Sequence, residues 1–531
     1  MSLFRTKPVA TLIAESLGTG EHAMKRELGP VNLISLGIGS VVGAGIFVLA
    51  GTSAANYAGP AIVLSYILCG ISCLFAGLCY AEFATQIPVA GSAYTYTYAT
   101  LGEFLAWIIG WDLVLEYLFS AAAVAVSWSD AIQSLLAEFG LKIPAVLAST
   151  PFAIDRSVMV TTNLGFYSFP HHPLVATGTL INLPAVIISL VLTVVLVVGI
   201  KESANFNNLM VFIKVGVLIV LIAYGAWWMF GHREIVAANW TPFIPENKGP
   251  PIRLHDGLGV FLQDMWAFCR SAEFGEFGWS GVLKGSAVIF FAYVGFDNVS
   301  AAAQESRNPQ RDMPIGLLGC LAICSLLFIG VSAVLTGMVK YTGLNVDAPF
   351  IFALQQVGAP GWLRFSIEIA TVAGLTSVCL VSLLGQPRIF FSMAKDGLLP
   401  GSFSRLHPRF KTPHVSTILT GVVCAIVAGL LPLDLLGELI SIGTLMAFAL
   451  VCAGVWVLRV KRPDLPRPFR TPWLPLVSIL GVATCLLQMY MLPADTWLRL
   501  AVWMAIGFVI YFGYSRRHSS QATPPAAPPP S

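Results

Sequence analysis

Long apolar runs separated by short polar segments dominate the chain. A membrane-spanning helix needs about 20 apolar residues. Runs of that order lie near 31–57, 60–85, 104–138, 181–200, 206–230, 284–304, 315–339, 361–388, 415–431, 437–459, 474–492 and 497–514. The pattern predicts an all-α polytopic membrane protein with about twelve transmembrane helices. Composition agrees, because 11% of the residues are charged, against about 25% in a soluble domain.

An even number of helices places both ends of the chain on one side of the membrane. The predicted loops on that side hold most of the 30 Lys and Arg residues. The positive-inside rule therefore predicts cytoplasmic termini in the cell membrane. The polar segment 1–30 lacks the compact apolar region and cleavage site of a signal peptide. The Pro/Ala-rich tail 515–531 is expected to be disordered.

The first apolar run is crowded with glycine. Gly37, Gly39, Gly43 and Gly45 fall within sixteen residues, Ser35 to Ala50. Glycine costs about 1 kcal/mol relative to alanine in a helix, and lipid offers no partner to freed backbone groups. We predict that the helix breaks at Gly43-Ala44-Gly45 and exposes N–H and C=O groups to a small polar ligand. Gly37 and Gly39 are expected to serve helix packing instead.

The sixth apolar run carries a second interruption. In Phe290–Asn298, Gly295 is followed at once by Asp297 and Asn298. An aspartate at mid-membrane is costly, about 2.5–3.5 kcal/mol even on translocon scales. Two interrupted helices five spans apart predict a 5+5 inverted repeat with broken helices 1 and 6. The expected segments are 31–230 and 284–460, joined by an outer loop 231–283 and followed by two extra helices in 461–514.

The rest of the composition argues against several other classes of protein. Most of the 10 cysteines lie inside the apolar runs, so no disulfide framework is implied. Histidine is absent from the middle of these runs, and no phosphate loop, zinc-protease or nucleophile-elbow motif occurs. The net charge of +3 is too small to indicate nucleic acid binding. We expect neither an enzyme nor a cofactor or metal site.

Several motifs along the chain together point to a family. They are Gly37-x-Gly39, Gly43–Phe47, Tyr80–Glu82, Pro88–Tyr94, Gly110–Tyr117, Phe291–Asp297, Glu305, Asn308-Pro309, Pro314–Gly316, Arg388 and Asp396–Pro400. With them the chain resembles bacterial members of the cationic amino acid transporter family, in the amino acid–polyamine–organocation superfamily. The resemblance extends from about Leu3 to the last helix. It implies an amino acid substrate bound between the two broken helices.

The resemblance also implies how the substrate backbone is held. The carboxylate would meet N–H groups of Ala44, Gly45 and Ile46, at a helix end that carries about half a positive charge. Glycine there lets the ligand approach the backbone closely. The α-ammonium would meet C=O groups at the ends of the first half-helices. These groups belong to Val41, Val42 and Gly43 and to Phe291, Ala292, Tyr293 and Val294.

Four side chains near this site have two open interpretations each. Phe291 resembles the family's aromatic gate, and it is otherwise a packing residue. Glu116 either contacts the substrate or a cationic side chain, or is a satisfied structural carboxylate. Asp297 is expected to hold the unwound segment together rather than touch the substrate. Ser382 leaves room for a long substrate side chain, or serves helix packing.

Lys214 is the one basic residue deep inside an apolar run. An unpaired lysine there is costly, so it is expected to face the bundle interior. The resemblance implies that it occupies the site between helices one and eight where sodium-coupled relatives bind a metal ion. Burial favours the neutral amine, so the side chain can exchange a proton. A fixed structural cation is the alternative.

These observations predict a proton-coupled symporter that imports α-amino acids, cationic or small neutral ones or both. An exchanger of the same fold is the first alternative, and a non-transporting amino acid sensor is a weaker one. The expected partners are the substrate, the proton and the lipid bilayer. The sequence does not specify an oligomeric state.

Overall fold

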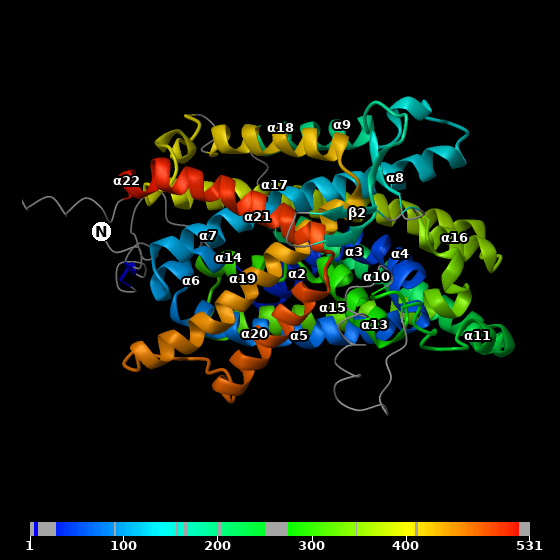
Figure 1. Cartoon of the computed structure of the whole chain (residues 1–531), viewed down its shortest axis with the longest axis horizontal. Helices are drawn as coiled ribbons and strands as arrows, with labels where there is room; N and C mark the ends of the chain where they lie inside the picture. The colour runs from blue at the N-terminus through cyan, green and yellow to red at the C-terminus, as the bar shows by residue number, and fades with distance from the viewer. Residues whose placement is uncertain are drawn as a thin grey trace, which may run out of the picture.

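Figure 1 shows the computed structural model of the chain, in which most helices run side by side along one axis. The structure describes residues 5–8, 28–89, 92–155, 158, 160–163, 168–198, 204–249, 274–346, 348–408 and 412–519. Most of the predicted segment 1–30, most of the tail 515–531 and the middle of the loop 231–283 lie outside these residues.

Twelve spans follow the predicted apolar runs closely. Nine helical stretches in the described residues are long and apolar enough to cross a membrane, and three shorter apolar helices complete the set. The first six spans are α2 (Pro30–Val41) with α3 (Ala44–Phe47), α4 (Leu49–Ser53) and η1 (Ala54–Ala58); α5 (Ile62–Gln86); α7 (Glu103–Val114) with η3 (Leu115–Phe119) and α8 (Ser120–Glu138); α9 (Leu183–Val198); α10 (Ala204–Gly231); and α13 (Gly278–Ile289) with η5 (Phe290–Tyr293) and α14 (Asn298–Ala301). The others are α15 (Pro309–Met338), α17 (Gly361–Lys395), α18 (His414–Leu430), α19 (Leu433–Lys461), α20 (Leu474–Met491) and α21 (Ala494–Ile510) with η9 (Tyr511–Ser515) and α22 (Arg516–His518).

Short elements cap the two ends of the bundle. Helix α6 lies at one end, and α11 and α16 lie at the other (Figure 1). Their bounds, with those of the remaining short turns, are η2 (Gly59–Ala61), α6 (Ser92–Thr100), η4 (Ala145–Leu147), α11 (Arg233–Asn239), η6 (Ala303–Glu305), η7 (Tyr341–Gly343), α16 (Pro349–Gln356) and η8 (Gly401–Ser404). In the loop 139–180, β1 (Phe152–Ile154) pairs antiparallel with β4 (Leu174–Ala176), and β2 (Val160–Asn163) with β3 (Ser168–His171).

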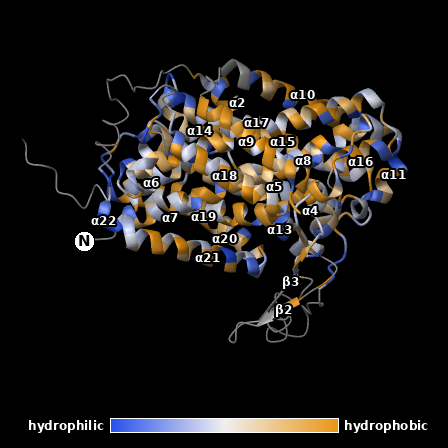
Figure 2. Cartoon of the chain, turned by 90° about the horizontal axis from the view of Figure 1, so that it is seen from above, coloured by the Kyte–Doolittle hydropathy of each residue, from blue (hydrophilic) through white to orange (hydrophobic). Residues whose placement is uncertain are grey.

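The outer surface of the bundle is apolar along its length. Large side chains such as Val194, Leu326 and Val509 are 63%, 72% and 73% exposed. Figure 2 shows hydrophobic residues along the helices and hydrophilic ones gathered at the ends, around α22 and α11. Such a surface is stable in hydrocarbon rather than in water. The chain is therefore a multi-pass membrane protein.

The two ends of the described chain meet at the same end of the bundle. The Lys7 N–H donates to the Tyr98 C=O over 3.2 Å, and the Glu103 N–H donates to the Arg5 C=O over 2.9 Å. The Ser519 hydroxyl donates to the Glu103 carboxylate. Both termini therefore lie on one side, as the even helix count predicted. The cytoplasmic assignment of that side remains a prediction.

Both predicted interruptions are present. Helix α2 ends at Val41, Val42 is extended, and α3 begins after Gly43. In the sixth span a 3-10 turn ends at Tyr293, Val294 is extended, and Gly295 takes a φ of +107° before α14 begins. That φ lies in the region that glycine adopts most readily. Helices 1 and 6 are thus broken in corresponding positions, as expected for an inverted repeat.

A buried carboxylate ties the second span to the tenth and eleventh. Glu82 on α5 has a side chain that is 2% exposed. It accepts hydrogen bonds from Arg459 at the end of α19 and from the Thr471 N–H before α20, the latter over 2.8 Å. Arg467 approaches the same carboxylate at 3.7 Å. The Tyr80–Glu82 motif therefore anchors the polar connection between α19 and α20.

We expect Glu82→Ala to lower the melting temperature of the purified protein in detergent. Removing one partner of a buried ion pair costs about 3–5 kcal/mol, and the partial exposure of Arg459 reduces this to about 2–3 kcal/mol. Asp464→Ala is the matched control, because the Arg462–Asp464 pair is 49% and 61% exposed. Its melting temperature should match the wild type. Equal effects of the two variants would contradict the anchoring role.

Candidate functional site

The two broken helices touch backbone to backbone. A Cβ placed on Gly45 would lie 2.3 Å from the Ala292 Cα and 2.7 Å from its nitrogen. A Cβ on Gly295 would lie 3.1 Å from the Ser40 Cβ. These separations leave no room for a side chain at Gly45. The sequence attributed this glycine to approach by a ligand, and the structure adds that the backbone of the sixth span fills the space beside its Cα.

The start of α3 offers unpaired donors. The N–H groups of Gly43, Ala44 and Gly45 have no acceptor in the described part of the chain. The Ile46 N–H, which the resemblance also assigned to the carboxylate, donates to the Gly43 C=O over 3.2 Å. Of the three predicted donors, those of Ala44 and Gly45 are therefore open, and Gly43 adds another. Unpaired N–H groups at the start of a helix attract an anion.

Some of the predicted acceptors are already engaged. The Phe291 C=O accepts the Val294 N–H over 3.2 Å, which closes the 3-10 turn. The Gly43 C=O accepts the N–H groups of Ile46 and Phe47 over 3.2 and 3.3 Å. No described donor reaches the other predicted C=O groups, which belong to Val41, Val42, Ala292, Tyr293 and Val294. These groups are open to an ammonium ion.

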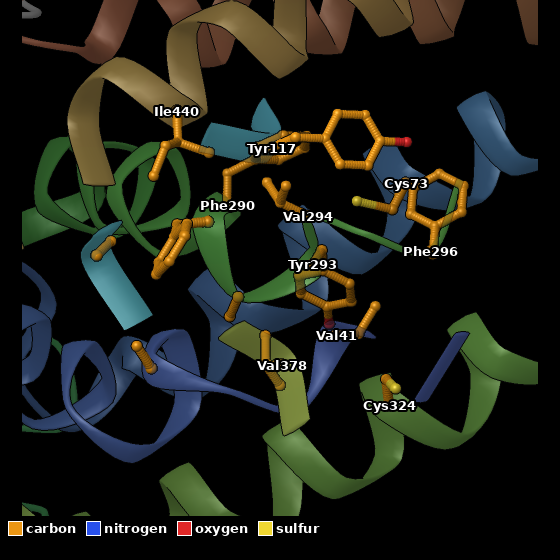
Figure 3. Close-up of a cluster of buried hydrophobic side chains, with 14 of the residues drawn as sticks. Val41, Cys73, Tyr117, Phe290, Tyr293, Val294, Phe296, Cys324, Val378 and Ile440 are labelled. Carbon is orange, nitrogen blue, oxygen red and sulfur yellow. The ribbon is translucent and has the colours of Figure 1, made fainter. Parts of the chain in front are cut away.

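Apolar side chains surround the breaks. Figure 3 shows Val41, Val294, Val378 and Ile440 gathered there with Tyr117 and Phe290. All six are buried. The sequence predicted Val41 and Val294 as backbone contacts but assigned no role here to Val378, Ile440 or Tyr117. The packing of α17, α19 and η3 against the breaks brings these three in, and no local motif marks that packing.

The two neighbouring phenylalanines differ in their surroundings. Phe290 is fully buried and packs edge-on against Phe448 of α19, with ring centroids 5.6 Å apart. Phe291 is 5% exposed. Phe290 is thus a packing residue. The gate role of Phe291 remains a prediction.

Lys214 lies where three helices meet. Its side chain on α10 is 2% exposed, and Nζ donates to the Gly39 C=O of α2 over 3.2 Å. A Cβ on Gly374 of α17 would lie 3.3 Å from the lysine Cε, so this glycine makes room for the side chain. No described carboxylate forms an ion pair with the ammonium. The position between helices one and eight is the one the sequence predicted.

Glu116 and Asp297 are two buried acids beside the breaks. Ser92 of α6 donates to Asp297 Oδ2 over 3.2 Å. Neither oxygen of Glu116 has a hydrogen-bond partner among the described residues. The Ser92 bond agrees with the structural interpretation of Asp297, in which it holds the unwound segment in place, and both interpretations of Glu116 stay open.

Ser382 lies one helical turn beyond Val378 on α17 and is 6% exposed. Three residues further on, Gly385 packs against the Tyr117 ring, and a Cβ placed on this glycine would lie only 2.4 Å from the ring carbons. Small residues on this face of α17 thus make space beside the apolar cluster. Whether that space admits a substrate side chain remains a prediction.

Two broken helices that meet at mid-bundle, open backbone groups and a buried lysine define a secondary transporter. The family model described as Amino acid permease matches residues 28–521. The chain belongs to this family, within the amino acid–polyamine–organocation superfamily that its motifs resemble.

Relatives are found in bacteria and plants. The chain is 42% identical to the methylthioribose transporter of Bacillus subtilis over 98% of this chain and 99% of that protein. It is also 42% identical to the branched-chain amino acid permease BcaP of the same species, over 98% of both chains. The vacuolar cationic amino acid transporter 4 of Arabidopsis thaliana is 34% identical over 84% of this chain and 65% of its own length. These relatives are named as transporters or permeases, and none as an enzyme.

We expect Gly45→Ala to abolish substrate binding and to destabilise the protein. The added Cβ forces the two broken helices apart, and overpacking of a tight contact costs about 1–3 kcal/mol. Gly216→Ala is the control, because no atom lies within 4 Å of its Cβ position on α10. In this control, the substrate affinity measured by calorimetry and the melting temperature in detergent should both match the wild type. Normal binding by Gly45→Ala would contradict the contact.

Proposed function

We propose that this protein is a proton-coupled symporter that imports α-amino acids across the cell membrane, with both termini in the cytoplasm. Lys214 carries the proposal. Among the described residues its ammonium group donates only to the Gly39 C=O, at the junction of the helices that must move relative to each other. Burial favours the neutral amine and access to water favours the charged one. Alternation between the two environments loads and releases a proton.

The open backbone groups support an α-amino acid as the substrate. The N–H groups of Gly43, Ala44 and Gly45 suit a carboxylate, and the C=O groups of Val41 and Val42 suit an ammonium. Because backbone groups bind both the carboxylate and the ammonium of the substrate, the side chains around the breaks determine which substrate side chain is accepted.

The surrounding cluster favours an apolar substrate side chain. Val294, Val378 and Ile440 present only hydrocarbon, and an apolar pocket gains free energy by removing a similar surface from water. The similarity to a branched-chain amino acid permease agrees with this choice. Cationic amino acids are the second candidate, supported by the plant relatives. Both oxygens of the buried Glu116 carboxyl group lack a hydrogen-bond partner among the described residues, so this group is the candidate partner of a cationic side chain.

An exchanger of the same fold would need no proton carrier, so a buried lysine without a carboxylate partner favours symport. A sensor would need a binding event that signals to another protein, and no feature of the described residues supports that.

We expect Lys214→Ala to remove the stimulation of amino acid uptake by an inward pH gradient. Substrate binding should be retained, because the carboxylate and ammonium sites are backbone groups. Lys395→Ala is the control, since this lysine lies at the end of α17 over the Phe391 ring and should keep the response. The assay is leucine uptake into proteoliposomes with independently imposed pH and sodium gradients. Uptake driven by sodium alone in the wild type would overturn the proton assignment, and uptake insensitive to both gradients would favour the exchanger.

We expect Ser382→Met to weaken binding of long substrates more than that of alanine. A longer side chain fills the space beside Val378, and overpacking of about 1–3 kcal/mol corresponds to a loss of affinity of about fivefold to 150-fold. Competition by leucine, lysine, arginine and alanine against a radiolabelled substrate measures the difference. An equal decrease for all four would make Ser382 a packing residue only. Wild-type competition by leucine but not by lysine would support the apolar pocket.

A further inference from the structure

The connection between α19 and α20 is strongly basic. We call residues 459–473 the basic loop. It contains one acid, Asp464, and five basic residues, which are Arg459, Lys461, Arg462, Arg467 and Arg470. The loop lies at the end of the bundle that α6 also marks (Figure 1). The Thr471 hydroxyl donates to the Leu78 C=O of α5 over 3.0 Å, so the loop is held against the protein.

Internal hydrogen bonds give the basic loop a fixed shape. The Arg467 side chain is 7% exposed. Its guanidinium donates to the C=O groups of Arg462, Pro463 and Leu465 over 2.6, 3.0 and 2.9 Å. Arg459 and Arg467 also share the Glu82 carboxylate, so these two arginines stabilise the fold. A loop that is already ordered loses little conformational entropy when its remaining side chains bind a partner.

Two cations of the basic loop remain without a counterion. Arg462 forms a bidentate pair with Asp464 over 2.7 and 3.0 Å. Lys461 and Arg470 are both exposed, and neither side chain forms an ion pair or a hydrogen bond with another described residue. These two side chains are therefore free to bind an anion.

Exposed apolar side chains flank these two cations. Val460 directly precedes Lys461 and is 70% exposed, and Trp473 follows Arg470 by three residues and is 82% exposed. In a protein whose outer surface faces hydrocarbon, an exposed tryptophan beside basic residues is typical of the interface between lipid and water. Basic clusters directly next to a membrane helix attract anionic lipid headgroups.

We infer that the basic loop is a binding surface for an anionic phospholipid. The lipid phosphate contacts Lys461 and Arg470, and the acyl chains contact Val460 and Trp473. A soluble phosphate compound would gain nothing from these apolar side chains, and a zwitterionic lipid carries a cation of its own that Lys461 and Arg470 repel. The inference needs only the location in the membrane, so it is independent of the transported substrate and of proton coupling.

The test uses the full-length protein in detergent, titrated with phosphatidylglycerol or with phosphatidylcholine of the same acyl chains. Native mass spectrometry measures the dissociation constant of each lipid. The wild type should bind phosphatidylglycerol more tightly. The double variant Lys461→Gln with Arg470→Gln should bind phosphatidylglycerol about 25-fold more weakly, because each basic residue near an anionic lipid contributes about fivefold. Its affinity for phosphatidylcholine should stay within about twofold of the wild type.

Lys142→Gln with Arg233→Gln is the matched control. It removes one exposed lysine and one exposed arginine outside the basic loop, Arg233 at the end of the bundle marked by α11 (Figure 1). This control should keep the phosphatidylglycerol affinity within about twofold. Equal wild-type affinities for the two lipids would overturn the inference, as would an equal loss in the control.

Three further measurements separate charge, acyl-chain contact and soluble phosphate. Lys461→Arg with Arg470→Lys keeps both charges and should keep the preference for phosphatidylglycerol. Trp473→Ala should weaken binding of both lipids by the same factor. Glycerol 3-phosphate, which carries the phosphate without acyl chains, should not displace phosphatidylglycerol. Loss of the preference in the charge-preserving variant, unchanged lipid binding by Trp473→Ala, or displacement by glycerol 3-phosphate would each contradict the lipid surface. The melting temperature of every variant should match the wild type, because the substituted side chains are exposed.

Discussion

The contact between Gly45 and Ala292 determines the centre of this protein. Two helices approach until backbone meets backbone, and both are broken at that point. A continuous helix would pair all its N–H and C=O groups internally, as lipid requires. Breaking two helices in the protein interior leaves some of these groups open where only another polar molecule can satisfy them. The cost of the breaks and the capacity to bind a charged substrate therefore have the same origin.

The neighbouring polar side chains support the breaks from opposite sides. Lys214 reaches the Gly39 C=O on one side of the first break. At the second break, Ser92 of α6 donates to Asp297 and joins the unwound segment to α6. The Lys214 bond satisfies a C=O group that the Gly43 N–H no longer reaches. A change of charge at Lys214 acts directly on the first half-helix. Protonation of Lys214 is thereby coupled to the position of that helix.

The sequence determined the spans, the two breaks, the shared side of the termini and the inward direction of Lys214. Each follows from local pattern: an apolar run, a glycine cluster, an even helix count, or a lysine that no membrane helix tolerates on its lipid face. The tertiary structure decided what surrounds the breaks. Val378, Ile440 and Tyr117 come from helices far apart in the chain. The close fit of Gly45 against Ala292, like the hydrogen bond from Ser92 to Asp297, depends on how whole helices pack. Local periodicity shows which residues face inward, but not which neighbour each one meets, because that depends on the relative rotation and depth of helices joined only by distant loops.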